Sequence, residues 1–85
     1  MKLLKFYSPS CAPCKALTPL VEELGQANRL VVEGIDVTKE PELAVKYDVR
    51  AVPTLVLVGE GGEQITSNVG LATQTTLSEW LGEYL

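Results

Sequence analysis

The decisive stretch lies at residues 5–15 and runs Lys-Phe-Tyr-Ser-Pro-Ser-Cys-Ala-Pro-Cys-Lys. Its first part belongs to a short, mostly apolar segment, Leu3 to Tyr7, which predicts a strand covered on both faces. Ser8-Pro9-Ser10 ends that strand. Beyond the second cysteine, leucine and valine recur at the i, i+3, i+4, i+7 spacing of a packed helix, which predicts a helix from Ala12 to about Ala27. The Cys-x-x-Cys motif therefore lies where a strand leads into a helix.

The remainder of the chain continues to alternate between strands and helices. We expect Asn28 to adopt the left-handed conformation after the first helix, and Thr73 to cap the last one. Four apolar residues stand at helical spacing after that cap: Leu77, Trp80, Leu81 and Tyr84. The segments between the first and last helices are a strand at Leu30–Val37, a helix at Pro41–Tyr47, and a hairpin of Thr54–Val58 and Glu63–Val69 around Gly59-Glu60-Gly61-Gly62.

This order of elements, β-α-β-α-β-β-α, predicts an α/β fold. A β-α-β opening implies two parallel strands joined by a right-handed crossover. The hairpin adds two strands that are antiparallel to each other. We therefore expect one four-stranded mixed sheet with helices on both faces. Because 85 residues suffice for one small domain, we expect residues 1–85 to form a single domain.

Composition and charge exclude several classes of function. Seven basic residues oppose eleven acidic ones, for a formal charge of −4, and the cations are scattered. Because nucleic-acid binders carry a basic stripe that displaces counterions, we expect neither a nucleic acid nor an anionic membrane as partner. No apolar run approaches the roughly 20 residues of a membrane span, and the N-terminus lacks a signal-peptide core, so we expect a cytoplasmic protein. The chain has no histidine, which excludes catalytic triads and dyads that use one.

The position of the cysteine pair favours thiol chemistry. The first N–H groups of a helix are unpaired and its dipole is positive there, and both effects favour a thiolate, the species that attacks a disulfide. We expect Cys11 to be the more exposed sulfur and the nucleophile. Cys14, one turn into the helix, is expected to be shielded and to resolve the mixed disulfide. Pro13 stiffens the turn between them.

Two other roles for the pair stay open at this point. A structural disulfide is one, although so short a loop removes little entropy from the unfolded chain. Half of a metal site is the other. Because zinc takes four ligands, a dimer that shares two Cys-x-x-Cys pairs is needed to hold zinc or an iron–sulfur cluster. A Cys-x-x-Cys motif within a β-α-β unit is more typical of redox chemistry.

These motifs resemble those of the thioredoxin family. Residues 5–15 are similar to its strand, active site and helix start, and Pro19 falls where that family kinks the helix. The stretch Val-Arg-Ala-Val-Pro-Thr-Leu at residues 49–55 is similar to the loop that holds the family's cis-proline. Gly62 and Val69-Gly70 match a hairpin turn and a glycine loop. The extra N-terminal strand and helix of full-length thioredoxins are absent, so the length resembles that of a glutaredoxin or a minimal archaeal or phage thioredoxin.

The resemblance implies a protein-disulfide reductase that binds no cofactor beyond its own redox-active disulfide. It implies a monomer that acts on disulfide-containing client proteins and takes electrons from an NADPH-dependent, thioredoxin-reductase-like enzyme. It also implies a cis bond between Val52 and Pro53 beside the cysteines, with the Val52 backbone free to pair with an extended substrate segment. From the pattern alone, Pro53 starts a strand and Val69-Gly70 end one. The implied substrate groove is lined by Ser10, Ala12, Pro13, Ala51, Val52, Pro53, Val69 and Gly70.

Two departures from the family pattern concern the surroundings of the thiols. Ser10 and Ala12 stand where thioredoxins usually carry tryptophan and glycine, so substrate contacts are expected to differ. Lys5 stands where they usually bury an acid. An ammonium near Cys14 stabilises its thiolate, which makes Lys5 a candidate for pKa tuning. The alternative is that Lys5 extends into solvent without effect.

A glutathione-dependent glutaredoxin is the main competing function. Glutaredoxins recognise glutathione with a Gly-Gly-x-Asp type of motif at a helix start, and the matching residues 69–73 contain no aspartate. A non-catalytic binding module with this fold is a further alternative. The retention of both cysteines argues against it, because such a module has no need of them.

Overall fold

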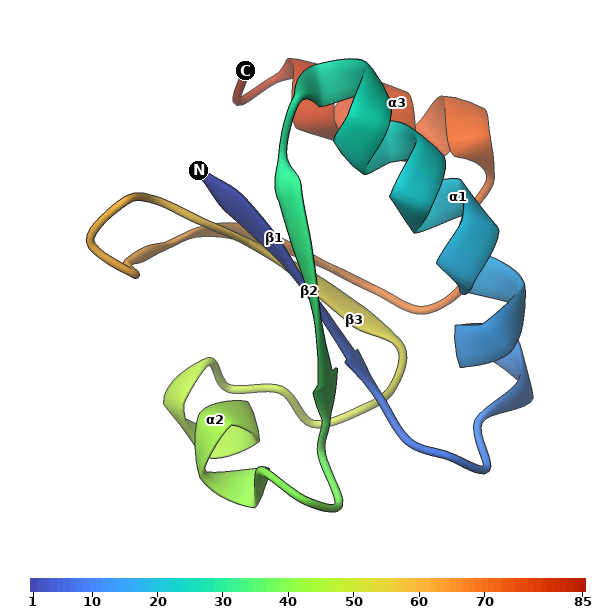
Figure 1. The fold of residues 1–85 in the computed structure, drawn as a ribbon, viewed down its shortest axis with the longest axis vertical. Coiled ribbons are helices and arrows are strands. Elements are labelled where there is room, and N and C mark those ends of the chain that lie inside the picture. The colour runs from blue at the N-terminus through green and yellow to red at the C-terminus, as the bar shows by residue number, and fades with distance from the viewer.

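A computed structural model describes all 85 residues, and its elements follow the predicted order. The four strands form one mixed sheet with the order β2-β1-β3-β4 (Figure 1). β1 and β2 are parallel, as a crossover through α1 requires, and β3 is antiparallel to both of its neighbours. None of the three helices is both long and apolar enough to cross a bilayer. The elements are β1 (Lys2–Tyr7), α1 (Ala12–Asn28), β2 (Val31–Asp36), α2 (Pro41–Lys46), β3 (Thr54–Val58), β4 (Gln64–Val69) and α3 (Gln74–Gly82).

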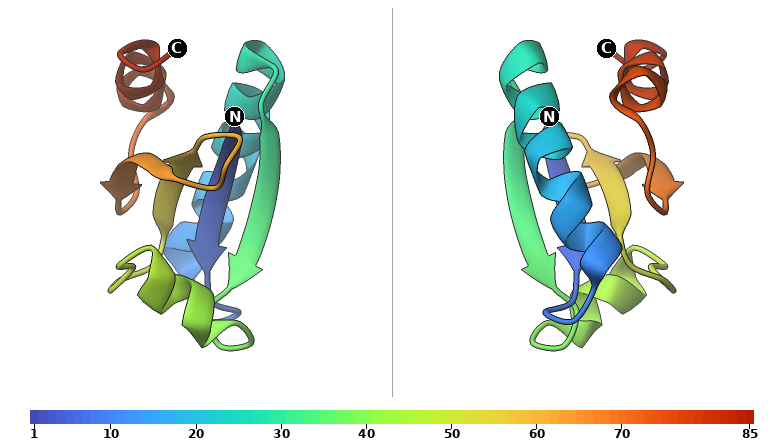
Figure 2. Two further views of the ribbon diagram at one scale, coloured as in Figure 1. Left: turned by 90° about the vertical axis from the view of Figure 1, so that its left-hand side faces the viewer. Right: turned by 90° about the vertical axis from the view of Figure 1, so that its right-hand side faces the viewer.

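The sheet separates two apolar clusters, and β1 contributes to both. Side chains alternate between the faces of a strand. Leu3 therefore joins the cluster beneath α1 and α3, whereas Leu4 and Phe6 join the cluster on the face covered by α2 (Figures 1 and 2). All three of these β1 side chains are buried, which confirms the prediction of a strand covered on both faces. The α/β fold with helices on both faces is confirmed with it.

The C-terminal end of α1 corrects one expectation. Arg29, and not Asn28, takes the left-handed conformation, with φ of 55°. Asn28 remains the last helical residue, because its Nδ2 donates a hydrogen bond to the carbonyl of Leu24 at 2.9 Å. The N–H of Leu30 then donates to the carbonyl of Gly25 at 2.8 Å, which closes the helix and turns the chain into β2.

The last helix follows its predicted start but ends early. Thr73 caps α3, since its Oγ1 accepts a hydrogen bond from the N–H of Thr76 at 3.2 Å. Trp80 is half-buried, and its Nε1 donates to Oγ1 of Thr66 on β4 at 3.2 Å. Tyr84 was expected in the apolar stripe, and this was wrong: it lies beyond Gly82, where α3 ends, and is 42% exposed.

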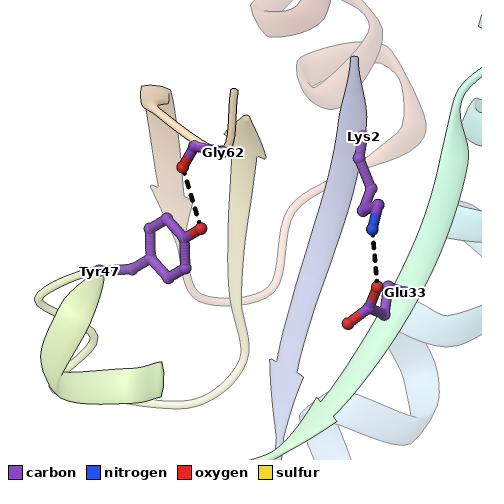
Figure 3. A network of polar contacts seen from close by, with 4 residues as sticks. All are labelled: Lys2, Glu33, Tyr47 and Gly62. Carbon is purple, nitrogen blue, oxygen red and sulfur yellow. Dashed lines mark hydrogen bonds and ion pairs between the residues drawn. The ribbon is translucent and has the colours of Figure 1, made fainter. Parts of the chain in front are cut away.

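Two polar contacts lie on the face of the sheet that carries α2, and Figure 3 shows both of them. The hydroxyl of Tyr47 donates to the carbonyl of Gly62 at 3.0 Å, which fastens the end of α2 to the turn between β3 and β4. Lys2 on β1 pairs with Glu33 on β2 at 2.9 Å. The hydrogen bond from Tyr47 to Gly62 also restrains the loop before β3, because the chain runs from Tyr47 directly into that loop.

We predict that Asp36 contributes a measurable part of the stability at neutral pH. Its carboxylate accepts hydrogen bonds from Oγ1 and N–H of Thr38, at 2.6 and 2.9 Å. These bonds lower the pKa of Asp36 below its usual 3.8. A lowered pKa gives stability that is present above pH 3.8 and is lost as the pH falls through the folded-state value. In urea unfolding between pH 7 and pH 2, Asp36→Asn should make the free energy of unfolding fall less steeply as the pH decreases. An unchanged pH dependence contradicts the prediction.

Candidate active site

The strand register brings three distant segments to one end of the sheet. Phe6, near the end of β1, pairs with Thr54, the first residue of β3. Thr54 also pairs with Val69, the last residue of β4. Three segments therefore meet at this end of the sheet: the loop that follows β1, the residues before β3 and the residues after β4. In Figure 1 the loop after β1 and the segment that enters β3 both lie at the lower right of the molecule.

Cys11 and Cys14 form a disulfide at the start of α1, with their Cα atoms 5.2 Å apart. Cys11 is the N-cap residue of the helix, and its Sγ accepts a hydrogen bond from the N–H of Cys14 at 3.1 Å. Cys14 is only 2% exposed, whereas Cys11 is half-buried, as the spacing predicts. An N–H group and the positive end of a helix dipole both face Cys11 Sγ, so a thiolate is favoured there after reduction.

The loop before β3 holds the predicted proline. The peptide bond between Val52 and Pro53 is cis, as the resemblance implies. Pro53 is buried, and its carbonyl accepts a hydrogen bond from the N–H of Gly70 at 2.9 Å. Gly70 has a φ of 91°, a conformation in which a side chain is strained. Ala51 is anchored through its carbonyl, which accepts from Oγ1 of Thr54 at 2.6 Å. The Gly70–Pro53 hydrogen bond therefore joins the residues before β3 directly to the residues after β4.

The remaining candidates for the substrate groove lie at the surface of this end. Ser10, Ala12 and Pro13 flank Cys11 and are exposed, and Val52 is half-buried. Val69 is 67% exposed although it closes the last strand. Val69 pairs with Thr54, so it lies at the same end of the sheet as the loop before β3. The backbone of Val69 and Gly70 also has the form of a strand end and its turn, as the pattern alone suggests.

Lys5 is held beneath α1 and does not extend freely into solvent. Its Nζ donates a hydrogen bond to Oγ1 of Thr18 and lies 5.4 Å from the centre of the Tyr7 ring. Thr18 in turn donates to the carbonyl of Cys14 at 3.1 Å. Burial lowers the pKa of Lys5 below its usual 10.5, and the negative charge of Glu22 partly opposes this. Sequence reasoning missed Thr18, although it stands one helical turn after Cys14.

The fold and this end of the sheet together define a class of protein. A strand leads into a Cys-x-x-Cys motif that opens a helix, the second cysteine is buried, and a cis-proline loop shares the same sheet edge. This is the arrangement of a thiol–disulfide oxidoreductase whose cysteine pair is the reactive group. No group of three or more His, Cys, Asp and Glu side chains is placed to hold a metal ion.

Comparisons with known proteins identify the family. Residues 1–83 match the sequence model of the family described as Thioredoxin. A thioredoxin of Bacillus subtilis is 39% identical over 85 residues, which cover 98% of this chain and 81% of that protein. Thioredoxin 1 of Nostoc is 33% identical, over 98% of this chain and 78% of that protein.

Solved structures lead to the same family. A thioredoxin variant from Halobacterium salinarum superposes with a TM-score of 0.87 at 41% identity, over 96% of this chain and 72% of that one. Oxidised mitochondrial thioredoxin 3 from Saccharomyces cerevisiae gives a TM-score of 0.81 at 34% identity, over 95% and 76% of the two chains.

The chain belongs to the thioredoxin family, and it is a thiol–disulfide oxidoreductase with Cys11 and Cys14 as its redox-active pair. The relatives are thioredoxins, which favours this activity over that of a glutaredoxin.

The difference in burial predicts how the reduced thiols react with an alkylating agent. Cys11 should be modified by iodoacetamide at least about tenfold faster than Cys14 at pH 7, because a reactive thiol needs both thiolate character and access. Peptide mass mapping after short reaction times measures the two rates separately. Equal rates, or faster modification of Cys14, contradict the assignment of Cys11 as the accessible sulfur.

Proposed function

We propose that this protein reduces disulfides of client proteins in two exchange steps, with Cys11 as the nucleophile and Cys14 as the resolving thiol. The observation that carries the assignment is the unequal burial of the pair. Cys14 is 2% exposed and Cys11 is half-buried at the helix start. A client sulfur therefore reaches Cys11 first, and Cys14 meets the mixed disulfide only from within the protein.

The two steps balance in atoms and electrons. The Cys11 thiolate attacks one sulfur of the client disulfide, a Cys11–client bond forms, and the other client sulfur leaves as a thiolate. The Cys14 thiol then loses its proton to solvent, and its thiolate attacks Cys11 Sγ. The Cys11–Cys14 bond forms and the second client sulfur departs with its electron pair. The client has gained two electrons and the protein has become the disulfide seen in the structure.

We propose that the client binds as an extended segment across the end of the sheet where β1 ends, β3 begins and β4 ends. Val52 precedes the cis bond to Pro53, so its backbone is the group that pairs with a client strand by β-augmentation. The exposed side chain of Val69, at the end of β4, offers the client an apolar contact. The remaining surface of this groove comes from Ser10, Ala12, Pro13, Ala51 and Gly70.

Members of the thioredoxin family generally reduce disulfide clients and are recharged by a thioredoxin reductase. We propose the same circuit here, with electrons that come from NADPH through a reductase of that kind. In this proposal residues 1–85 act as one domain, in a monomer, in the cytoplasm, where a reducing environment suits the reductive direction.

Trapping of the intermediate tests the order of attack. Cys14→Ser should accumulate a mixed disulfide with a disulfide substrate such as insulin, because the resolving thiol is missing. Cys11→Ser should neither reduce the substrate nor trap it at an appreciable rate. Mass spectrometry of the unreduced product reveals the adduct and the cysteine that carries it.

Wild-type protein with excess dithiothreitol serves as the control, since it should reduce insulin without a lasting adduct. An adduct on Cys14 in the Cys11→Ser variant, formed as fast as the adduct on Cys11, reverses the proposed roles. Absence of insulin reduction by the wild type overturns the proposed activity on protein disulfides.

A further inference from the structure

Two cavities lie between α1 and the sheet, and they share one wall. The wall that both cavities have in common is formed by Lys5, Tyr7 and Thr18. One cavity, of about 170 Å³, is completed by Ser8, Pro9, Cys14 and Lys15. The other, of about 300 Å³, is completed by Val21, Glu22, Val32 and Gly34. Lys5 therefore lies between the cavity that reaches Cys14 and the cavity that reaches Glu22.

The cavity that reaches Cys14 is lined by cations and contains no carboxylate. Besides Cys14, its ionisable groups are Lys5, Lys15 and the phenol of Tyr7. Glu22 lines only the second cavity, on the other side of the shared wall. The residues that β2 contributes there, Val32 and Gly34, are uncharged. An anion at Cys14 thus shares its cavity with two cations and no acid, and Glu22 lines the neighbouring cavity on the other side of Lys5.

Hydrogen bonds hold the Lys5 ammonium in this place. Its Nζ donates to Oγ1 of Thr18, and the same hydroxyl donates to the carbonyl of Cys14, so one side chain connects the lysine to the backbone of the cysteine. The Tyr7 ring flanks the ammonium from the neighbouring end of β1. A charge that is fixed and partly desolvated acts more strongly on its surroundings than one at the tip of a free side chain.

We propose that Lys5 is a positioning residue for the second exchange step, which holds a positive charge beside the small cavity and stabilises the Cys14 thiolate. This inference rests on the proposed function, because it concerns the step in which Cys14 resolves the mixed disulfide. Burial alone raises the pKa of a thiol, and an opposite charge nearby lowers it. Lys5 offsets the burial of Cys14, the proton leaves through the cavity to solvent, and the thiolate attacks Cys11 Sγ.

The same interaction has a consequence for the redox equilibrium. Only the reduced protein carries a Cys14 thiolate, so an ammonium beside it stabilises the reduced state and makes the protein a weaker reductant. In the oxidised protein the ammonium has no thiolate to face, and its pKa is lowered by burial. Because coupling between two sites is reciprocal, the pKa of Lys5 should rise when the disulfide is reduced.

The first test is the titration of Cys14 as the only thiol, in a Cys11→Ser background. Adding Lys5→Met should raise the pKa of Cys14 by about one unit, in line with the loss of an adjacent opposite charge. Lys5→Gln should do the same, although its amide is able to keep a hydrogen bond to Thr18. The glutamine variant therefore distinguishes the effect of the charge from the effect of the contact with Thr18. It also replaces the methionine variant if that variant fails to fold.

Lys2→Met is the matched control, because it removes the same charge from the same strand on the opposite face of the sheet. It should leave the titration of Cys14 unchanged. A Cys14 pKa that is the same with Lys5, Met or Gln at this position overturns the inference. So does an equal shift in the Lys2 variant, because the effect is then one of net charge.

The second test is the exchange equilibrium of the intact cysteine pair with glutathione. At a pH above the Cys14 pKa of both proteins, where the thiolate is the reduced species, Lys5→Gln should shift it about tenfold towards the disulfide, or about 30 mV to more negative potential for two electrons. An unchanged equilibrium contradicts the inference. The titration does not depend on any client. A shifted Cys14 pKa without insulin reduction by the wild type defeats the proposed function alone, and insulin reduction without a shift defeats the inference alone.

Discussion

β1 lies between β2 and β3 and is covered by apolar clusters on both of its faces. Its backbone pairs with β2 on one side and β3 on the other, and its side chains enter both apolar clusters. A strand in that position cannot slip by one residue without turning Leu4 and Phe6 out of their cluster. Its end is therefore fixed, and with it the start of the loop that leads to Cys11, at the same end of the sheet as Pro53, the residue before β3.

Most of the fold could be predicted from local patterns, because alternating strands, helical stripes and turn residues all agree with one sheet. The errors occur where a single side chain decides the outcome. Asn28 binds the carbonyl of Leu24 and stays helical, so the left-handed residue is Arg29. Tyr84 has the right spacing for the stripe of α3 but lies beyond its end. Helix ends depend on such contacts, which spacing does not encode.

The site could be predicted less completely than the fold. The spacing and position of the two cysteines indicate their chemistry, because both the bond and the helix start are local features. The place of Lys5 is not local: it depends on how α1 lies over β1, which brings Thr18 within reach of its ammonium. Lys5 interrupts the run from Leu3 to Phe6, whose other members are all buried and apolar, and such breaks tend to mark functional sites. We propose that each cysteine has its own source of positive potential, the helix start for Cys11 and Lys5 for Cys14.

The redox equilibrium of the Cys11–Cys14 pair decides whether the two cysteines act as a reversible redox couple. The purified chain is brought to equilibrium in a series of thiol–disulfide buffers, alkylated and weighed, so that each redox state is counted by mass. We expect one reversible two-electron transition between a dithiol and an internal disulfide, at a reducing potential. A pair that stays reduced under mildly oxidising conditions, or that never closes an internal disulfide, contradicts it.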